Sequence, residues 1–367
     1  MKKIIITFLS LILLTGCSFF QNDDSNLQPA NEQKTIELYQ ETNYSYYYQS
    51  LDDDEKELYT EIYNCLTNYD NKTEINTADY DTVSKINDYV LYDHPEIFYL
   101  NYYEIQNQVS HYYYLPKYSY TENEVTDLTN QLETVRNDFI NSLDSSLSDY
   151  DKLKAVYNFV IEKSTYVEGA KDNQQVTSAL IYGNTVCSGY VKAIQYLCDG
   201  LNINTAYIVG KPLVQTTENT EYHAWNLVVL EDDYYYIDAT WGDYVDDNNS
   251  FTMYSYFMFD SNDMLKLYQP TDKYETTKTN TYCYFNHDGY YNNTYDLSNL
   301  SSMVRKYQNT NIQWMEFKFS DDCYQKAKSS LIDQQEMFDL FDNFASGQYQ
   351  INYIYLDNLN VLIFKLA

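Results

Sequence analysis

Positively charged residues are scarce in this chain of 367 residues. There are 23 Lys and Arg against 54 Asp and Glu, which gives a formal charge of −31, and the only arginines are Arg136 and Arg305. An acidic surface repels phosphate backbones, so nucleic acid is a poor partner. The acidic residues are spread along the chain without a long block, and we interpret them as a source of solubility.

The cysteine and histidine patterns of metal centres are also missing. No two of the six cysteines have the CxxC spacing that zinc knuckles and thioredoxin-type sites require. His94, His111 and His287 have no metal-ligand spacing, so we predict no metal site. Glycine and proline are rare, with 9 and 5 residues, whereas tyrosine occurs 45 times. We interpret this imbalance as the mark of a compositionally biased genome.

The N-terminus lacks an apolar run long enough to cross a bilayer comfortably as a helix. Lys2 and Lys3 precede the apolar residues 4–14, and the tetrapeptide Leu-Thr-Gly-Cys ends at Cys17. This tetrapeptide resembles the lipobox of bacterial lipoproteins. The resemblance implies that residues 1–16 are a signal peptide and that a lipid on Cys17 anchors the protein to the cell membrane, at its extracytoplasmic face. The alternative is an ordinary signal peptide or a short membrane anchor.

The chain is long enough, and with 44% hydrophobic residues apolar enough, to form two or three units with a sizeable core. Residues 17–34 are polar and aperiodic, and we expect them to act as a tether. Beyond them we predict an α-rich N-terminal region at 35–149, a central core at 150–265 and a small α+β C-terminal domain at 280–367.

Hydrophobic periodicity predicts the elements of the two flanking regions. In the N-terminal region it predicts helices at about 52–66 and 122–143 and a strand at 97–100. In the C-terminal domain it predicts a strand at 312–319, a helix at about 321–344, and strands at 351–356 and 361–366. No chemical motif stands out in either flank.

The central core has a clearer pattern. Apolar residues at 153–161 predict one helix, and a second is expected to begin at Cys187 and stop at Gly200. Two apolar runs follow, at 223–230 and 234–241, joined by a short acidic link. This is the pattern of a β-hairpin.

Cys187 lies where the second helix of the core should start. The positive end of a helix dipole and its unpaired N–H groups lower the pKa of a thiol and favour the reactive thiolate. The same N–H groups would stabilise an oxyanion on an attacked carbonyl. Judged alone, such a cysteine is more often an inert buried thiol.

His223 and Asp238 lie on the two strands of the predicted hairpin. With Glu231 and Asp232 as the link, Trp225 faces Asp238, and Asp238 becomes a diagonal neighbour of His223 at about 7–8 Å between backbones. A carboxylate placed there would fix the imidazole tautomer and favour its protonated form, which in turn supports a thiolate. The link is weak evidence, because Glu-Asp lacks the glycine that two-residue hairpins prefer.

Together, these segments resemble the three core motifs of the transglutaminase-like superfamily, in order and in spacing. The motifs are Val-Cys-Ser-Gly-Tyr at 186–190, His-Ala-Trp-Asn at 223–226 and Ile-Asp-Ala-Thr-Trp-Gly-Asp at 237–243. The resemblance implies an α+β, papain-like core in which a nucleophile helix packs on an antiparallel sheet. It implies Cys187 as nucleophile, His223 as general base and acid, and Asp238 as the orienting carboxylate.

The function that this resemblance implies is cysteine-dependent acyl transfer or hydrolysis at peptide or glutamine amide bonds, through a thioester and without a cofactor. The substrate would be a protein or peptide, for example one associated with the cell wall. The alternative is a cell-surface binding module that keeps the fold without catalysis. A solute-binding lipoprotein is a weaker alternative, because the repeated βα halves of that class are missing.

Overall fold

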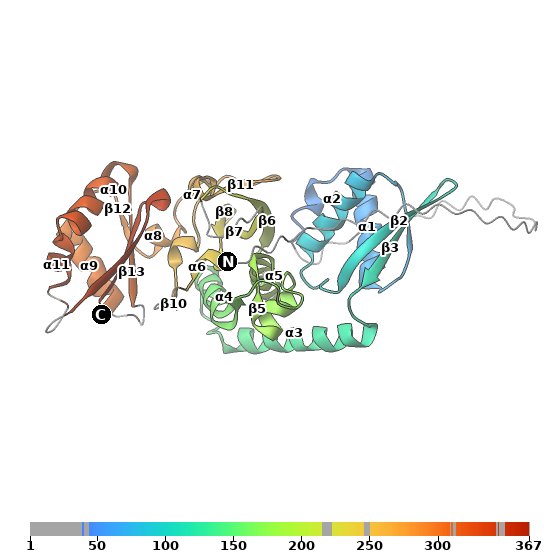
Figure 1. Cartoon of the computed structure of the whole chain (residues 1–367), viewed down its shortest axis with the longest axis horizontal. Coiled ribbons are helices and arrows are strands. Elements are labelled where there is room, and N and C mark those ends of the chain that lie inside the picture. Colours follow the sequence, from blue (N-terminus) through green and yellow to red (C-terminus); the bar gives the residue numbers. More distant parts are fainter. Residues whose placement is uncertain are drawn as a thin grey trace, which may run out of the picture. The chain divides into compact units, whose positions relative to one another are not determined.

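The computed structural model describes residues 39, 44–214, 222–245, 250–308, 310, 313–342, 344 and 349–366. The expected signal peptide at 1–16, the lipidation residue Cys17 and the tether at 17–34 lie outside this part of the chain. The described residues form both helices and sheets (Figure 1), which confirms the predicted α+β class. None of the helices in these ranges is long and apolar enough to cross a membrane.

The N-terminal region contains the helices α1 at Asp53–Thr67 and α2 at Tyr80–Asp93. Asp52 caps α1 by accepting a hydrogen bond from the Glu55 N–H, while the Glu55 side chain bonds back to the Asp52 N–H. This reciprocal capping box fixes the start of the helix. The first predicted helix, at about 52–66, is therefore confirmed.

The same region also contains a three-stranded antiparallel sheet that the sequence did not lead us to expect. Its order is β1-β3-β2, with bounds Thr73–Ile75, His111–Tyr118 and Leu100–Gln108. The predicted strand at 97–100 is wrong except for its last residue. Ile97, Phe98 and Tyr99 are buried in an irregular segment before β2, so burial, and not a strand, explains their apolar run.

Helix α3, at Glu122–Ser142, confirms the predicted helix at 122–143. It packs against α5 at Cys187–Gly200, which is the predicted nucleophile helix. The Arg136 guanidinium lies 4.5 Å from the centroid of the Tyr196 ring. Arg136 and Ile140 also approach Gly200 so closely that a Cβ there would lie 2.7 Å from the Arg136 side chain. Gly200 therefore makes room for α3, and the expected C-terminal stop follows at Leu201.

The central core contains a four-stranded antiparallel sheet and the helices α4, at Asp149–Lys163, and α5, which pack against each other (Figure 1). The strand order is β11-β6-β7-β8, with bounds Tyr268–Pro270, Thr205–Pro212, His223–Leu230 and Asp233–Ile237. α5 packs on β6 and β7. The Asn226 side chain in β7 donates a 3.0 Å hydrogen bond to the Val191 carbonyl, which fixes the helix to the sheet.

The hairpin β7–β8 has the predicted register but a shorter second strand. Leu230 pairs with Asp233 and Asn226 with Ile237, so Glu231 and Asp232 form the two-residue link. Both have positive φ, 52° and 59°, the conformation for which such links prefer glycine or asparagine. The predicted strand at 234–241 is wrong after Ile237, because Asp238 caps the short helix α6 at Ala239–Gly242.

The C-terminal region forms another four-stranded sheet, of order β12-β13-β15-β14, with bounds Tyr291–Asn292, Trp314–Phe319, Val361–Leu366 and Ile351–Leu356. The predicted strands at 351–356 and 361–366 are confirmed. The strand predicted at 312–319 corresponds to β13, but residue 312 lies outside the described residues. The predicted helix at 321–344 is wrong as a single helix. It divides into α10 at Asp321–Lys328, η4 at Ser329–Asp333 and α11 at Glu336–Phe341. Gln335, with a φ of 64°, separates the last two.

A further helix, α9 at Leu297–Gln308, was missed by the sequence analysis. The remaining elements are short. They are η1 Tyr48–Ser50, β4 Thr165–Tyr166, η2 Ser178–Tyr182, β5 Asn184–Thr185, β9 Asp243–Val245, β10 Ser250–Thr252, η3 Tyr254–Tyr256, α7 Ser261–Leu267, α8 Tyr284–His287 and η5 Asp357–Leu359.

Candidate active site

Cys187 is the first residue of α5, as predicted. The residue before the helix, Val186, provides no side-chain cap, so the N–H groups at this end lack a side-chain partner. The carbonyl of Val186 accepts from the N–H groups of Gly189 and Tyr190. Within the described residues no acceptor bonds the N–H groups of Cys187 and Ser188. The thiol therefore lies beside two unpaired donors at the positive end of the helix dipole.

Cys187 also differs from the other described cysteines in its exposure. Cys65, Cys198, Cys283 and Cys323 are buried, whereas Cys187 is partly exposed and all five thiols are free. Burial raises the pKa of Cys65 and of Cys198, which makes these thiols inert at neutral pH. Among the described thiols, Cys187 alone combines access with a surrounding that favours the thiolate.

His223 and Asp238 are in direct contact. The Nε2 atom of His223 lies 2.7 Å from the Oδ2 atom of Asp238, and the two residues are only 5% and 1% exposed. Asp238 owes its position to α6, because its Oδ1 atom accepts hydrogen bonds from the N–H groups of Thr240 and Trp241 at 2.9 and 3.1 Å. Asp238 thus caps α6 with its Oδ1 atom and presents its Oδ2 atom to the imidazole of His223.

The structure brings Cys187, His223 and Asp238 together. Burial alone would lower the pKa of His223, but the charge and hydrogen bond of Asp238, together with Cys187, raise it to about 10. Burial would raise the pKa of the Cys187 thiol, yet the hydrogen bond and charge of His223 and the Ala224 N–H hold it below its usual value. Both shifts favour a thiolate–imidazolium pair at neutral pH.

Aromatic rings enclose the imidazole. Trp241 is partly buried and stacks on His223 with centroids 5.1 Å apart, whereas Trp225 is fully buried and belongs to the core. Tyr268 packs on Trp225 at 4.2 Å, and its hydroxyl donates a 2.5 Å hydrogen bond to Asp238. Sequence reasoning missed Tyr268, because it lies 30 residues beyond Asp238 and is one of 45 tyrosines.

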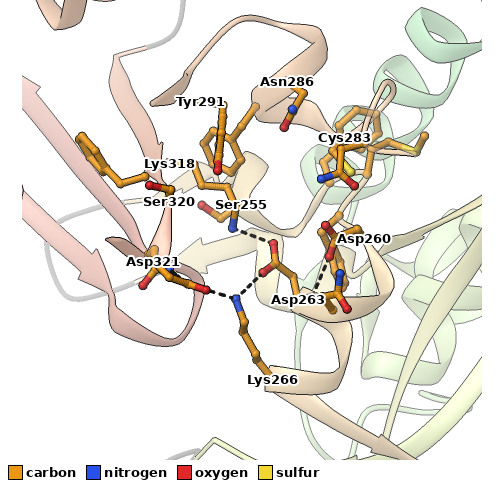
Figure 2. A pocket seen from close by; sticks show the side chains of 18 residues that line it. Ser255, Asp260, Asp263, Lys266, Cys283, Asn286, Tyr291, Lys318, Ser320 and Asp321 are labelled. Carbon is orange, nitrogen blue, oxygen red and sulfur yellow. Dashed lines mark hydrogen bonds and ion pairs between the residues drawn. The ribbon is translucent and has the colours of Figure 1, made fainter. Parts of the chain in front are cut away.

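A separate pocket of about 270 Å³ lies between the 255–266 segment and the C-terminal sheet, and Cys187, His223 and Asp238 are not among the residues that line it (Figure 2). Its charges largely neutralise one another. Asp263 accepts hydrogen bonds from Lys266 at 3.0 Å and from Lys318 at 2.7 Å, and Lys318 also donates to the Leu359 carbonyl. These paired groups fasten two parts of the fold together.

No group of three or more His, Cys, Asp and Glu residues within the described ranges has an arrangement that would hold a metal ion. His94 is buried and bonded to Glu96, while His111 and His287 are paired with the carboxylates of Glu74 and Asp288. These histidines make local contacts with carboxylates, apart from the contacts of Cys187, His223 and Asp238.

Comparison with known families agrees with this geometry. Residues 137–239, which include Cys187, His223 and Asp238, match the family model of the transglutaminase-like superfamily. Residues 1–18 match the prokaryotic membrane lipoprotein lipid attachment site. The chain therefore carries a transglutaminase-like domain, as its motifs predicted, together with the attachment signal of a lipid-anchored membrane protein. No curated protein matches the sequence.

Several solved structures match parts of the chain. A candidate cysteine protease from Cytophaga hutchinsonii is 14% identical, with 41% of this chain and 65% of that chain covered and a TM-score of 0.27. A TGase is 14% identical, with 41% and 46% covered and a TM-score of 0.28. A candidate protease from Parabacteroides distasonis is 7% identical, with 36% and 29% covered and a TM-score of 0.23. The chain spans at most 65% of the length of these three structures.

Proposed function

We propose that this chain is a cysteine-dependent acyl transferase or hydrolase that acts on peptide or glutamine amide bonds through a thioester. Cys187 is the nucleophile, His223 the general base and acid, and Asp238 the carboxylate that orients the imidazole. The observation that carries the proposal is the combination of a partly exposed thiol at a helix N-terminus with a buried His–Asp pair.

The proposed reaction begins with attack of the Cys187 thiolate on the carbonyl carbon of a carboxamide or peptide bond. The tetrahedral intermediate carries a negative oxygen, and the unpaired N–H groups of Cys187 and Ser188 are suited to stabilise it. His223 then gives its proton to the departing nitrogen as the C–N bond breaks and a thioester forms. Water or a primary amine next attacks the thioester, gives a proton to His223 and releases Cys187.

The same charges explain why the pair would work at neutral pH. A thiolate needs a nearby cation in a buried site, and the imidazolium supplies it. The imidazolium in turn needs a carboxylate, because burial alone would lower the pKa of His223. Each member of the triad therefore keeps its neighbour in the charge state that the reaction requires.

The lipid attachment signal suggests where in the cell the proposed activity would take place. If Cys17 carries the lipid, the folded part would act at the extracytoplasmic face of the cell membrane on proteins or peptides within reach, including components of the cell wall. The strongly acidic chain would favour substrates that are not themselves highly acidic.

The test is the pH dependence of iodoacetamide labelling at each cysteine of the full chain, read by mass spectrometry, in the wild type and in His223→Ala. We expect Cys187 to be labelled at least tenfold faster than free cysteine at pH 6.5, and to lose that advantage in the variant. His94→Ala is a matched control, because His94 is also buried and paired with a carboxylate but is not in the triad.

Slow labelling of Cys187 in both proteins would overturn the acyl-transfer mechanism and favour the non-catalytic binding module. Equal losses in His223→Ala and His94→Ala would mean that the variants disturb the fold, and not a specific thiol–imidazole pair. The buried Cys198 serves as an internal reference, since rapid labelling at this position reports unfolding.

A further inference from the structure

The carboxylate of Asp238 is shared between two donors. Its Oδ2 atom accepts a hydrogen bond from His223 Nε2 at 2.7 Å and another from the Tyr268 hydroxyl at 2.5 Å. Tyr268 is the first residue of β11, the edge strand next to β6, and its side chain is fully buried. The imidazole and the phenol therefore compete for the same oxygen.

The Tyr268 ring is held so that its hydroxyl points at this oxygen. Its ring stacks on Trp225 with centroids 4.2 Å apart and planes 18° apart, and it packs against Trp241 at 4.8 Å. The backbone is fixed as well, because Tyr268 pairs with Pro212 of β6. A side chain locked on both sides makes a directed contact, and not an incidental one.

Asp238 does not need Tyr268 to stay in place. Its Oδ1 atom is bonded to the N–H groups of Thr240 and Trp241, and its own N–H donates to the Tyr256 carbonyl. Together with the contact to His223, these bonds define the orientation of the carboxylate. Loss of the phenol hydroxyl would therefore change the charge available to the imidazole more than the geometry of the pair.

We propose that Tyr268 is a positioning residue of the triad that acts through Asp238, by drawing part of the carboxylate charge away from His223. The inference rests on the proposed function. An unshared carboxylate in a buried site would hold the imidazolium so firmly that His223 would be a poor acid. With Tyr268 bonded to the same oxygen, the imidazole still receives a proton from Cys187 but releases it more readily to the departing nitrogen.

The experiment measures the protonation of His223 directly. The full chain contains four histidines, so a sample labelled at the histidine Cε1 carbon gives four NMR signals, and the one lost in His223→Ala is assigned. A Cys187→Ala background removes the contribution of the thiol. In this background we expect Tyr268→Phe to raise the pH midpoint of His223 by about one unit, since one hydrogen bond to the carboxylate is lost.

Two further variants make the test specific. Tyr256→Phe is the matched control, because Tyr256 is also buried and its ring packs on Trp241, but its hydroxyl makes no hydrogen bond to Asp238 in the described structure. We expect this variant to leave the His223 midpoint unchanged. Replacement of Tyr268 by 3-fluorotyrosine keeps the ring and makes the phenol a stronger donor, so the midpoint should fall.

A midpoint that stays the same or falls in Tyr268→Phe would overturn the proposal, as would an equal rise in Tyr256→Phe. The fluorotyrosine variant decides the question even if Tyr268→Phe does not fold, because the inference requires its midpoint to fall. The result is separable from the proposed function. An unreactive Cys187 would contradict acyl transfer, whereas the His223 midpoint in the Cys187→Ala background reports only on Tyr268, Asp238 and the imidazole.

Discussion

Asp238 influences the ionisation of both His223 and Cys187. It is 1% exposed, and its bond to His223 opposes the effect of burial on the imidazole. The raised pKa of His223 then keeps a positive charge beside Cys187, which lowers the pKa of the thiol. The Asp238 carboxylate thus favours the thiolate through the imidazole, while its own negative charge acts in the opposite direction on the pKa of the thiol.

Replacement of Asp238 by asparagine should therefore silence Cys187 while the fold is kept. The Asn oxygen still accepts from the N–H groups of Thr240 and Trp241, but the charge on the His223 side is lost. Burial then dominates, His223 becomes neutral at pH 7, and the pKa of Cys187 rises. We expect the rate of iodoacetamide labelling at pH 6.5 to fall at least tenfold.

The matched control for this substitution is Asp243→Asn. Asp243 also lies at the end of α6, where it accepts a 2.6 Å hydrogen bond from the Tyr190 hydroxyl, but it has no contact with His223. Its substitution should leave the labelling rate of Cys187 within about twofold of the wild type. An unchanged rate in Asp238→Asn would contradict the dependence of the thiolate on this carboxylate.

The sequence predicted those residues of the candidate site that a single helix or hairpin positions. It did not predict the residue that reaches the site from a distant strand. Cys187 was placed by the start of a helix, and His223 and Asp238 by the register of one hairpin, which the structure reproduces. Tyr268 reaches Asp238 from an edge strand that pairs with β6, and neither its spacing nor its residue type distinguishes it. Pairing between distant strands depends on the whole sheet, which a local pattern does not contain.

At the scale of elements, α5 contains two glycines that serve different contacts. A Cβ on Gly189 would lie 1.8 Å from Thr185 Oγ1 and 2.8 Å from Ser178 Oγ, which are hydrogen-bonded to each other in the buried interior. A Cβ on Gly200 would meet the middle of the Arg136 side chain and the end of the Ile140 side chain. The first neighbours are short and fixed, whereas the second are long and can move.

The two alanine substitutions should therefore have different effects on stability. Alanine is favoured over glycine in a helix interior by about 1 kcal/mol, and the gain is smaller at Gly200, because this is the last residue of α5. At Gly189 the clash should outweigh it and lower the free energy of unfolding by about 2 kcal/mol. Gly200→Ala should change it by less than about 1 kcal/mol. Urea unfolding of both variants checks this, and equal effects would contradict the packing argument.

Other element boundaries show which forces sequence periodicity does not capture. The strand predicted at 234–241 ends at Ile237, because the Asp238 side chain bonds the N–H groups of the following turn and starts α6. The helix predicted at 321–344 is divided at Gln335, which has a left-handed backbone conformation. No local sequence pattern predicted this conformation. In both cases the apolar spacing was correct, but a single backbone conformation changed the element.

At the scale of the whole molecule, a buried carboxylate joins the C-terminal sheet to the core. Glu316 of β13 is 1% exposed and accepts hydrogen bonds from the N–H groups of Tyr254 and Ser255, at 2.6 and 2.7 Å, and from the Ser255 hydroxyl. The carbonyl of Tyr256, the next residue in this turn, accepts a hydrogen bond from the N–H of Asp238. The turn at 254–256 thus contacts both the C-terminal sheet and the backbone of Asp238.

Glu316 should make the stability of the folded chain depend on pH. Burial raises its pKa to about 7, in spite of the hydrogen bonds that favour the charged form. Because this folded-state pKa lies above that of the unfolded chain, its contribution to stability is complete at low pH and is lost as the pH rises towards 7. We expect the free energy of unfolding to fall by on the order of 3 kcal/mol between pH 4.5 and pH 8 from this residue alone.

The difference between wild type and Glu316→Gln isolates this contribution from those of other buried acids, such as Asp93 and Asp199, whose pKa values burial also raises. The glutamine variant should be less stable throughout, since it loses acceptors for Ser255, but its stability should decline less with pH. Glu104→Gln, on the exposed surface of β2, controls for the loss of one charge from an acidic chain. Parallel urea-derived stability curves for wild type and Glu316→Gln from pH 4.5 to 8 would contradict the prediction, because they would mean that folding does not raise the pKa of Glu316.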